Sequence, residues 1–350
     1  MHRGSIVIVT PALAKANNGN WQTASRWARL LRPAYRVRVV DRWTAHDEGA
    51  DVMIALHARR SAAAVAAWRG AHPQRPLVLV LTGTDLYRDI HDDASAQRSL
   101  ALADALVVLN ELGAEALPAE HRARCHVVLQ SCPARRMLPR TVRHLRAWMV
   151  GHLRDEKDPQ TYFAAARLLA GRPDIRLDHI GAALDPALGD AAAVLAAEQP
   201  TYRWLGGLPH AAVRGHIQRA HVLVHASRME GGAHVVIEAL RSGTPVLASR
   251  IAGNLGLLGA GYTGVFEAGD AAGLAALLAR ARDDAAMLAG LQMQCQVRAP
   301  LFSPQAEHAA LLALLTTLTP SLSSLPLPPS TPTPLQPRPS GPGTLERDRS

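Results

Sequence analysis

Cysteines, aromatic residues and long apolar runs are all scarce in this 350-residue sequence, and each shortage excludes a class of protein. The three cysteines, Cys125, Cys132 and Cys295, include no Cys-x-x-Cys pair, so we expect neither a disulfide framework nor a zinc site. They are expected to be small buried apolar residues. No stretch of about 18 apolar residues is free of charges and helix breakers, which argues against a transmembrane helix.

The sequence also lacks the order of a secretory signal at its N-terminus. Residues 5–10, SIVIVT, form a strand pattern at once, without a preceding basic region, apolar region and small-residue cleavage site. A cytoplasmic location is therefore the expectation.

Basic residues outnumber acidic ones by 38 to 29, which gives a net charge of +9. The basic residues are mostly arginines scattered along the chain, and aromatic residues make up only 4%. A surface that binds nucleic acid and stacks its bases needs basic and aromatic residues concentrated in one place. A nucleic-acid-binding protein is therefore a remote alternative, because phosphorylated small molecules suit the same charge.

Short apolar segments alternate with helical patterns along most of the chain. Apolar runs of this kind, separated by helices, predict a parallel sheet that is covered on both faces. The expected strands are at residues 5–10, 35–41, 51–58, 76–85, 105–110, 126–131, 147–152, 175–181, 201–206, 221–227 and 244–249. The expected helices are at residues 22–31, 61–71, 95–103, 159–169, 186–198, 233–240, 271–281 and 304–318.

This pattern predicts an α/β protein with two Rossmann-like, doubly wound domains that face a cleft. The first domain is expected at residues 1–140 and the second at residues 141–300. A helix at residues 301–319 follows, and the Pro/Ser-rich tail at residues 320–350 is expected to be disordered. Ligands usually bind in such a cleft, at the carboxyl ends of the strands.

The segment SRMEGGAHVVIEALRSGTPVLAS offers the strongest candidate site in the second domain. Gly231 and Gly232 remove two side chains where the backbone enters a helix, so N–H groups can point at an anion. Glu230 and Glu238 are carboxylates on either side of that entry. A surface ion pair between Glu238 and Arg241, three residues apart on the helix, is an equally available interpretation.

A second charged segment, VGHLRDEKD, follows the first strand of the second domain. Arg154 and Lys157 stand in the loop that enters the next helix, where two cations can bind a diphosphate. The alternative is a charged loop in which Arg154 and Lys157 are neutralised by Asp155 and Glu156.

Together, the Glu-x7-Glu pattern and the upstream Arg…Lys pair resemble glycosyltransferases of the two-Rossmann-domain type B, near family 4. The resemblance covers about 300 residues. It implies that Glu238 binds the ribose hydroxyls of a nucleotide-sugar donor, and that Arg154 and Lys157 bind its diphosphate. It also implies that Glu230 and the Gly231–Ala233 segment lie at the sugar ring, and that the helix after Ser303 crosses back onto the first domain.

In the first domain, polar residues follow several predicted strands. The loop after the first strand carries Lys15 and opens a helix, where we expect Gly19, Asn20 and Thr23 to contact the donor. An ordinary strand-to-helix turn, with Thr23 near the helix N-terminus, explains that loop equally well.

Two further strand ends of the first domain carry hydroxyls, arginines and an aspartate, which bind anions well. The candidate acceptor residues are Lys15, Arg59, Arg60, Thr82, Gly83, Thr84, Asp85 and Arg88, with His57 beside them. A histidine at such a place is often only a structural residue, and this alternative stays open for His57.

The phrases NNGNWQTASRW, ALHARRSA, LTGTDLYRDI and VVLQS, with SRIAGN and GLLG later in the chain, resemble the selenosugar synthases of the selenoneine pathway. The resemblance implies transfer of a sugar from UDP-N-acetylglucosamine or UDP-glucose to selenophosphate. His57, Arg154, Lys157 and Glu230 would be catalytic. No cofactor or metal is implied, and no Asp-x-Asp motif is present. A glycosyltransferase that uses a carbohydrate or lipid hydroxyl as acceptor is the nearer alternative.

Overall fold

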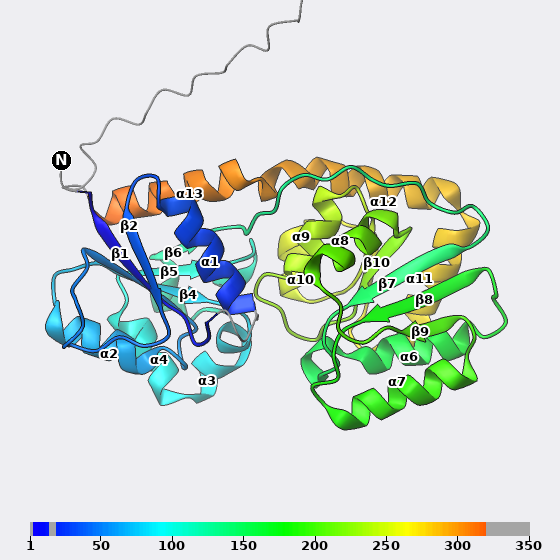
Figure 1. The fold of residues 1–350 in the computed structure, drawn as a ribbon, viewed down its shortest axis with the longest axis horizontal. Helices are drawn as coiled ribbons and strands as arrows, with labels where there is room; N and C mark the ends of the chain where they lie inside the picture. Colours follow the sequence, from blue (N-terminus) through cyan, green and yellow to red (C-terminus); the bar gives the residue numbers. More distant parts are fainter. Residues whose placement is uncertain (1–2, 14–18, 320–350) are drawn as a thin grey trace, which may run out of the picture.

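The computed structural model describes residues 3–13 and 19–319, which form two α/β lobes side by side (Figure 1). Each lobe contains a six-stranded sheet in which all paired strands are parallel. The prediction of two doubly wound α/β domains is confirmed. The predictions for Lys15 and for the tail at residues 320–350 lie outside the described residues.

The first sheet has the strand order β2-β1-β3-β4-β5-β6. Its strands are β1 (Ser5–Val9), β2 (Arg36–Val40), β3 (Val52–Leu56), β4 (Leu77–Leu81), β5 (Ala105–Val108) and β6 (Cys125–Val127). Its helical segments are α1 (Gly19–Leu31), α2 (Ala62–Ala71), the π-helical turn η2 (Asp85–Asp89), α3 (Ile90–Asp92), α4 (Ala94–Leu102), η3 (Gly113–Ala116) and α5 (Ala119–Arg122). Every residue of β3 and β4 is buried, which is why these segments are continuously apolar.

The second sheet has the order β12-β11-β10-β7-β8-β9. Its strands are β7 (Leu145–Val150), β8 (Ile175–Ile180), β9 (Tyr202–Trp204), β10 (Val222–His225), β11 (Val246–Ser249) and β12 (Val265–Phe266). Its helical segments are η4 (Asp155–Lys157), α6 (Pro159–Leu168), α7 (Pro186–Glu198), α8 (His210–Arg219), α9 (His234–Arg241), α10 (Ala252–Leu258), α11 (Ala271–Asp283), α12 (Ala285–Arg298) and η5 (Ala299–Phe302). The direction in which the strands are added reverses between β7 and β10. In open α/β sheets, ligands usually bind beside such a switch point.

Helix α13 (Pro304–Leu318) follows the second domain in sequence but packs on the first. In Figure 1 it lies along the top of the first lobe. Alternate residues of β3 serve the two faces of the first sheet: Met53 packs with α2 and α4, whereas Ile54 packs with α1 and α13. Leu311, Leu314 and Leu315 of α13 thus complete a core of the first domain.

A buried carboxylate fixes α13 in that position. Glu307 accepts hydrogen bonds from Arg26 Nε at 2.9 Å, from Trp27 Nε1 at 2.7 Å and from the Ser131 backbone N–H at 3.0 Å. Arg26 and Trp27 belong to α1, and Ser131 follows β6. Because Glu307 is 1% exposed, its charge depends on these partners rather than on water.

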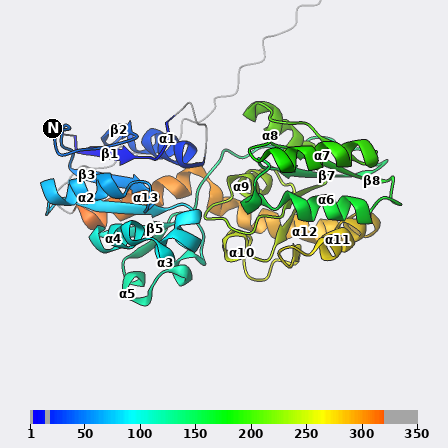
Figure 2. The ribbon, with the colours of Figure 1, turned by 90° about the horizontal axis from the view of Figure 1, so that it is seen from below.

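No helix within residues 3–13 and 19–319 is long and apolar enough to cross a membrane. Seen from below, the two lobes again lie side by side (Figure 2).

We expect His179 of β8 to make the stability of the second domain depend on pH. Burial lowers the pKa of its imidazole to about 4, against an opposing hydrogen bond to the Gly151 carbonyl. The native ring is therefore neutral at pH 6, whereas the unfolded chain takes up a proton below pH 6.5. We expect His179 to contribute about 3 kcal/mol of stability near pH 7 that is lost as the pH falls from 6.5 to 4.

Denaturant unfolding at several pH values checks this expectation. Other buried histidines titrate in the same range, so the measurement is the difference between the protein and a His179→Asn variant. A variant whose stability falls with acid as steeply as that of the unchanged protein contradicts the assignment to His179.

Candidate functional site

The carboxyl ends of β7 and β10 bring Lys157 and Glu230 together. Lys157 ends the short helix η4 after β7, and Glu230 lies in the loop after β10. The Lys157 ammonium forms an ion pair with Glu230 Oε1, and His225 Nε2 lies 3.4 Å from the same oxygen. The Glu230 side chain is 12% exposed, so this is a largely desolvated charge pair.

The pair sets the charge of Glu230. Burial alone would raise the pKa of this carboxyl, but the Lys157 charge and the contact with His225 outweigh it and hold the pKa well below its usual range. Glu230 is therefore an anion near neutral pH. An ammonium has three donors, so Lys157 can keep this carboxylate and still donate to a second anion.

Arg154 stands at the start of the same loop, with its side chain 45% exposed. Its Nε atom lies 3.9 Å from Glu156 Oε2, a loose contact for an ion pair. Asp155 instead accepts from Arg228 at 3.2 Å. The alternative in which the loop neutralises its own charges therefore holds only for Arg154 and Glu156.

Glu238 lies on the buried side of α9, where its carboxylate accepts from His210 Nε2 at 2.7 Å. Arg241 donates instead to the backbone carbonyls of Cys132 and Ala299, both at 3.1 Å. The helix spacing allowed a surface ion pair between Glu238 and Arg241. The described side chains form a different arrangement, in which Glu238 is bound from the neighbouring helix α8.

The two glycines after Glu230 make room for the first domain. A Cβ atom on Gly231 would lie 2.5 Å from the carbonyl oxygen of Thr82, and one on Gly232 would lie 2.9 Å from Leu109 Cβ. The sequence suggested that these glycines free backbone N–H groups for an anion. In the structure, the absence of their side chains permits a close approach between the two domains. Helix α9 starts only after Ala233, its N-cap residue.

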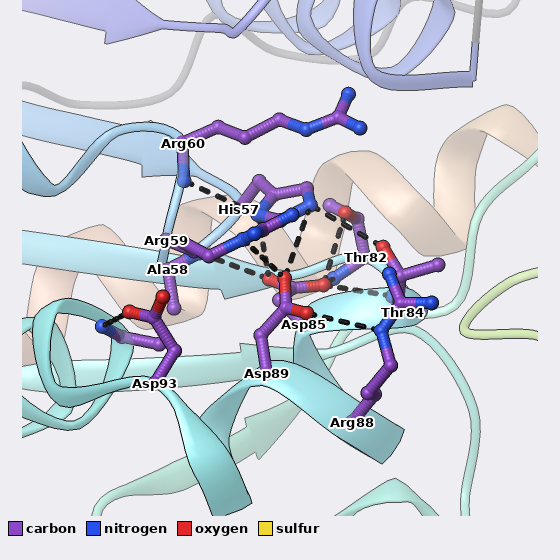
Figure 3. Close-up of polar contacts among 12 residues, drawn as sticks. His57, Ala58, Arg59, Arg60, Thr82, Thr84, Asp85, Arg88, Asp89 and Asp93 are labelled. Atoms are coloured by element: carbon purple, nitrogen blue, oxygen red, sulfur yellow. Dashed lines mark hydrogen bonds and ion pairs between the residues drawn. The ribbon is translucent and has the colours of Figure 1, made fainter.

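Across this contact, Asp85 organises the end of β4 (Figure 3). Its carboxylate accepts from the backbone N–H groups of Thr82 at 2.8 Å, Gly83 at 3.0 Å and Ala58 at 3.0 Å. Asp85 is fully buried and therefore acts as the fixed centre that joins the ends of β3 and β4.

His57, the first residue after β3, has a backbone φ of 75° although it is not glycine. Such a conformation is costly and is found most often at functional sites. The ring is 2% exposed; Thr84 Oγ1 lies 3.3 Å from Nε2, and Asp85 Oδ2 lies 3.9 Å from Nδ1. Burial lowers the pKa of His57, which Asp85 opposes and Arg60 assists, so the ring is mainly neutral at pH 7.

Three arginines surround this cluster. Arg59 and Arg88 both bind Asp89, at 3.0 and 3.2 Å, and Asp89 Oδ2 lies 3.9 Å from His57 Nε2. Figure 3 shows the Arg60 side chain extending above His57 and away from the carboxylates. Arg59 and Arg88 are each almost half exposed, so their unused donors remain accessible to an anion.

The N-terminal turn of α1 lies beside the linker that leaves the first domain. Gly19 and Asn20 begin the helix, and the Thr23 hydroxyl donates to the Gly19 carbonyl at 2.8 Å and accepts from Gln130 Nε2 at 2.7 Å. The interpretation of Thr23 as a residue that fixes the start of α1 thus agrees with its contacts. Its role toward a donor stays a prediction.

The structure brings two of the predicted groups together. The Thr82–Gly83 backbone touches Gly231, and Arg88 Nη1 lies 4.0 Å from Glu156 Oε1 across the domain junction. Glu238 is held farther along α9 by His210.

Sequence reasoning missed the three partners His210, His225 and Asp89, because none stands in a recognisable motif. One signal was present for Lys157. Among 38 basic residues, only Lys15 and Lys157 are lysines, so a lysine in this chain is itself unusual. Within the described ranges, no three His, Cys, Asp or Glu side chains form a group suited to a metal ion.

Residues 141–295 match the family model described as glycosyl transferases group 1. No curated protein matches the chain. Among solved structures, it is similar to TarM of S. aureus in complex with fondaparinux, alpha-GlcNAc-glycerol and UDP. That likeness has 12% identity and a TM-score of 0.60, and covers 75% of this chain and 55% of TarM, about half its length.

Two other solved structures match over almost the whole chain. They are the sucrose-phosphate synthase from Thermosynechococcus elongatus (16% identity, TM-score 0.73, covering 91% of this chain and 100% of that one) and HepE from Anabaena in complex with UDP and glucose (16% identity, TM-score 0.69, covering 90% and 100%). At these identities the likeness shows the fold, which is the GT-B arrangement of two Rossmann-like domains.

Proposed function

We propose that the chain transfers a sugar from a UDP-sugar to selenophosphate, on the premise that residues 141–295 match the model of glycosyl transferases group 1. The observation that carries the proposal is the ion pair between Lys157 and Glu230, which places a cation and a carboxylate where β7 and β10 diverge. The UDP bound to TarM and to HepE supports the choice of nucleotide.

In this proposal, Lys157 and Arg154 bind the diphosphate of the donor and stabilise the charge on the departing UDP, a contribution often worth several kcal/mol. Glu238 binds the ribose hydroxyls, and Glu230 lies at the sugar ring with Gly231, Gly232 and Ala233. The first turn of α1, with Gly19, Asn20 and Thr23, contacts the donor from the other domain.

The acceptor site is proposed at the ends of β3 and β4. Arg59, Arg60 and Arg88 bind the phosphoryl oxygens of selenophosphate, together with Lys15, which lies outside the described residues. The Thr82–Asp85 segment shapes the floor of this site, and His57 lies beneath the arginines. Cationic groups beside the anomeric carbon hold a small anion in position for attack.

The reaction has two bond-changing steps. A selenium lone pair attacks the anomeric carbon, and the C–O bond to UDP breaks with its electron pair on the UDP oxygen. Water then attacks phosphorus, and the Se–P bond breaks with its electrons on selenium. The products are a 1-selenosugar, UDP and phosphate, as selenoneine biosynthesis requires. Selenophosphate needs no deprotonation at selenium, so a base is not essential.

A hydroxyl acceptor is the second candidate, because one observation favours it. A neutral, buried histidine is the kind of group that acts as a general base, and the Asp85 carboxylate lies 3.9 Å from Nδ1 of His57, beyond hydrogen-bond distance. In that case His57 removes a proton from a carbohydrate or lipid hydroxyl.

One experiment separates the two candidates. The protein is incubated with UDP-N-acetylglucosamine or UDP-glucose and either selenophosphate or a panel of sugar and lipid alcohols, and UDP release and product mass are measured. Formation of a selenosugar supports the proposal. Transfer to alcohols alone supports the second candidate, and no UDP release with any acceptor rejects both.

We expect Glu238→Ala to weaken UDP binding about tenfold, because a carboxylate that bridges two ribose hydroxyls is lost. Isothermal calorimetry measures the affinity, and a melting curve verifies folding. His210→Ala is the matched control, since it removes the partner of Glu238 but not the carboxylate. Unchanged UDP affinity in a folded Glu238→Ala protein removes Glu238 from the donor site.

A further inference from the structure

Asn110 lies at the point where the two domains touch. It follows β5, is fully buried, and donates from Nδ2 to the Gly231 carbonyl of the other domain at 2.8 Å. The same nitrogen donates to the Tyr87 hydroxyl at 3.1 Å, and Oδ1 accepts from the Leu112 backbone N–H at 3.0 Å. Both ends of the amide are therefore fixed, one of them across the cleft.

Three glycines let the backbones close around this side chain. Gly83, with φ 138°, and Gly231 meet directly, since a Cβ on Gly83 would lie 3.0 Å from Gly231 N. On the other side, a Cβ on Gly256 of α10 would lie 2.4 Å from Asn110 Oδ1. The Glu111 N–H donates to the Gly256 carbonyl at 3.2 Å, which continues the same junction.

The carbonyl that Asn110 binds belongs to the residue after Glu230. Holding this carbonyl fixes the turn that carries Glu230, and it also fixes how far that turn stands from Thr82 and Gly83. Each domain carries only some of the candidate site residues. The distance between the first-domain residues and the second-domain residues therefore depends on this junction.

We propose that Asn110 is a positioning residue, which holds the closed arrangement of the domains and sets the Glu230 turn against the first-domain site. The effect of Asn110 on kcat rests on the proposed sugar transfer. Without the amide donor, the buried Gly231 carbonyl loses its partner, and the closed state loses stability relative to an open one. UDP still binds, because most of its proposed contacts, Arg154, Lys157 and Glu238, belong to the second domain.

Asn110→Ala is expected to lower kcat for sugar transfer about tenfold, with KM for the UDP-sugar and the affinity for UDP within about twofold of the unchanged protein. Small-angle X-ray scattering of the ligand-free protein is expected to give a larger radius of gyration for the variant. Tyr262→Phe is the matched control, because it removes two buried hydrogen bonds to Val246 within the second domain.

Asn110→Asp separates positioning from simple stability. The carboxylate has the same shape and can still accept from Leu112, but it cannot donate to the Gly231 carbonyl. We therefore expect it to lose at least as much kcat as Asn110→Ala, with KM for the UDP-sugar still within about twofold, whereas a merely structural role lowers the melting temperature without this selective loss of kcat. An unchanged kcat in Asn110→Ala, a milder Asn110→Asp, or an unchanged radius of gyration overturns the proposal.

Gly231→Ala tests the contact from the opposite side and is expected to enlarge the radius of gyration as well. Gly171→Ala, which places a Cβ where no atom lies within 4 Å, is its control. A Gly231→Ala protein as compact as the control counts against the junction. Scattering needs no substrate, so the radius of gyration tests the positioning proposal whether or not sugar transfer is found. An absence of sugar transfer contradicts only the proposed function, whereas an unchanged radius of gyration contradicts the positioning proposal.

Discussion

We expect Lys157→Met to lower kcat/KM for the proposed sugar transfer at least a hundredfold. The substitution removes the cation proposed to face the diphosphate, and it also leaves the Glu230 carboxylate largely buried without its ion-pair partner. Loss of one partner of a buried pair typically costs about 3–5 kcal/mol. The pKa of Glu230 then rises, because burial is no longer outweighed by the Lys157 charge. Affinity for UDP and the melting temperature fall together.

Steady-state kinetics with a UDP-sugar and calorimetry with UDP measure these losses. Arg250→Met is the matched control, since Arg250 pairs with Glu267 at 2.7 Å on an exposed surface and is expected to change neither quantity. Lys157→Arg keeps the charge but not the compact ammonium, and is expected to recover part of the activity. A Lys157→Met enzyme with normal UDP affinity shows that this lysine serves only the fold.

Glu307→Ala destabilises the protein by about 3–5 kcal/mol, the largest expected effect on the fold. The carboxylate accepts from Arg26, Trp27 and Ser131, so its removal leaves a buried guanidinium and an indole N–H without an acceptor. Helix α13 loses its polar attachment to the first domain. Its leucines still pack on the sheet, so we expect weakened docking rather than complete detachment.

Denaturant unfolding measures this change. Glu198→Ala is the control, because Glu198 pairs with Arg167 at 3.8 Å between two half-exposed side chains and is expected to change stability by less than about 0.5 kcal/mol. The double variant Arg26→Met with Glu307→Leu is expected to regain most of the loss, since it leaves no buried charge unpaired. Equal stabilities for Glu307→Ala and Glu198→Ala contradict the role of this carboxylate.

The fold was largely predictable because its strands are buried on both faces. The segments VMIAL and LVLVL are short and continuously apolar, which is typical of strands buried on both faces of a sheet. Strands that are separated by helices in this way pair in parallel. Two of the helices that escaped prediction, α8 and α12, have thin apolar faces. Only Val213 and Ile217 of α8 and only Leu291 and Cys295 of α12 are buried, so the helical period hardly registers in the sequence.

The candidate site was predictable as a location but not as a set of contacts. The rule that ligands bind at the carboxyl ends of strands placed Lys157 and Glu230 at one edge. It could not say that the two side chains pair, or that His210, 28 residues before Glu238, binds that carboxylate. Asn110 reads as the end of an apolar strand, and its contact with Gly231 exists only once both domains have formed.

The position of α13 in the sequence also determines when the first domain can finish folding during synthesis. The first domain is synthesised early, but the leucines that cover one face of its sheet are made about 300 residues into the chain. Until they emerge from the ribosome, that apolar face stays uncovered and the strands of the first sheet lack their full support. The first domain is thus completed only after the second domain has been translated, and its uncovered sheet is open to aggregation in the meantime.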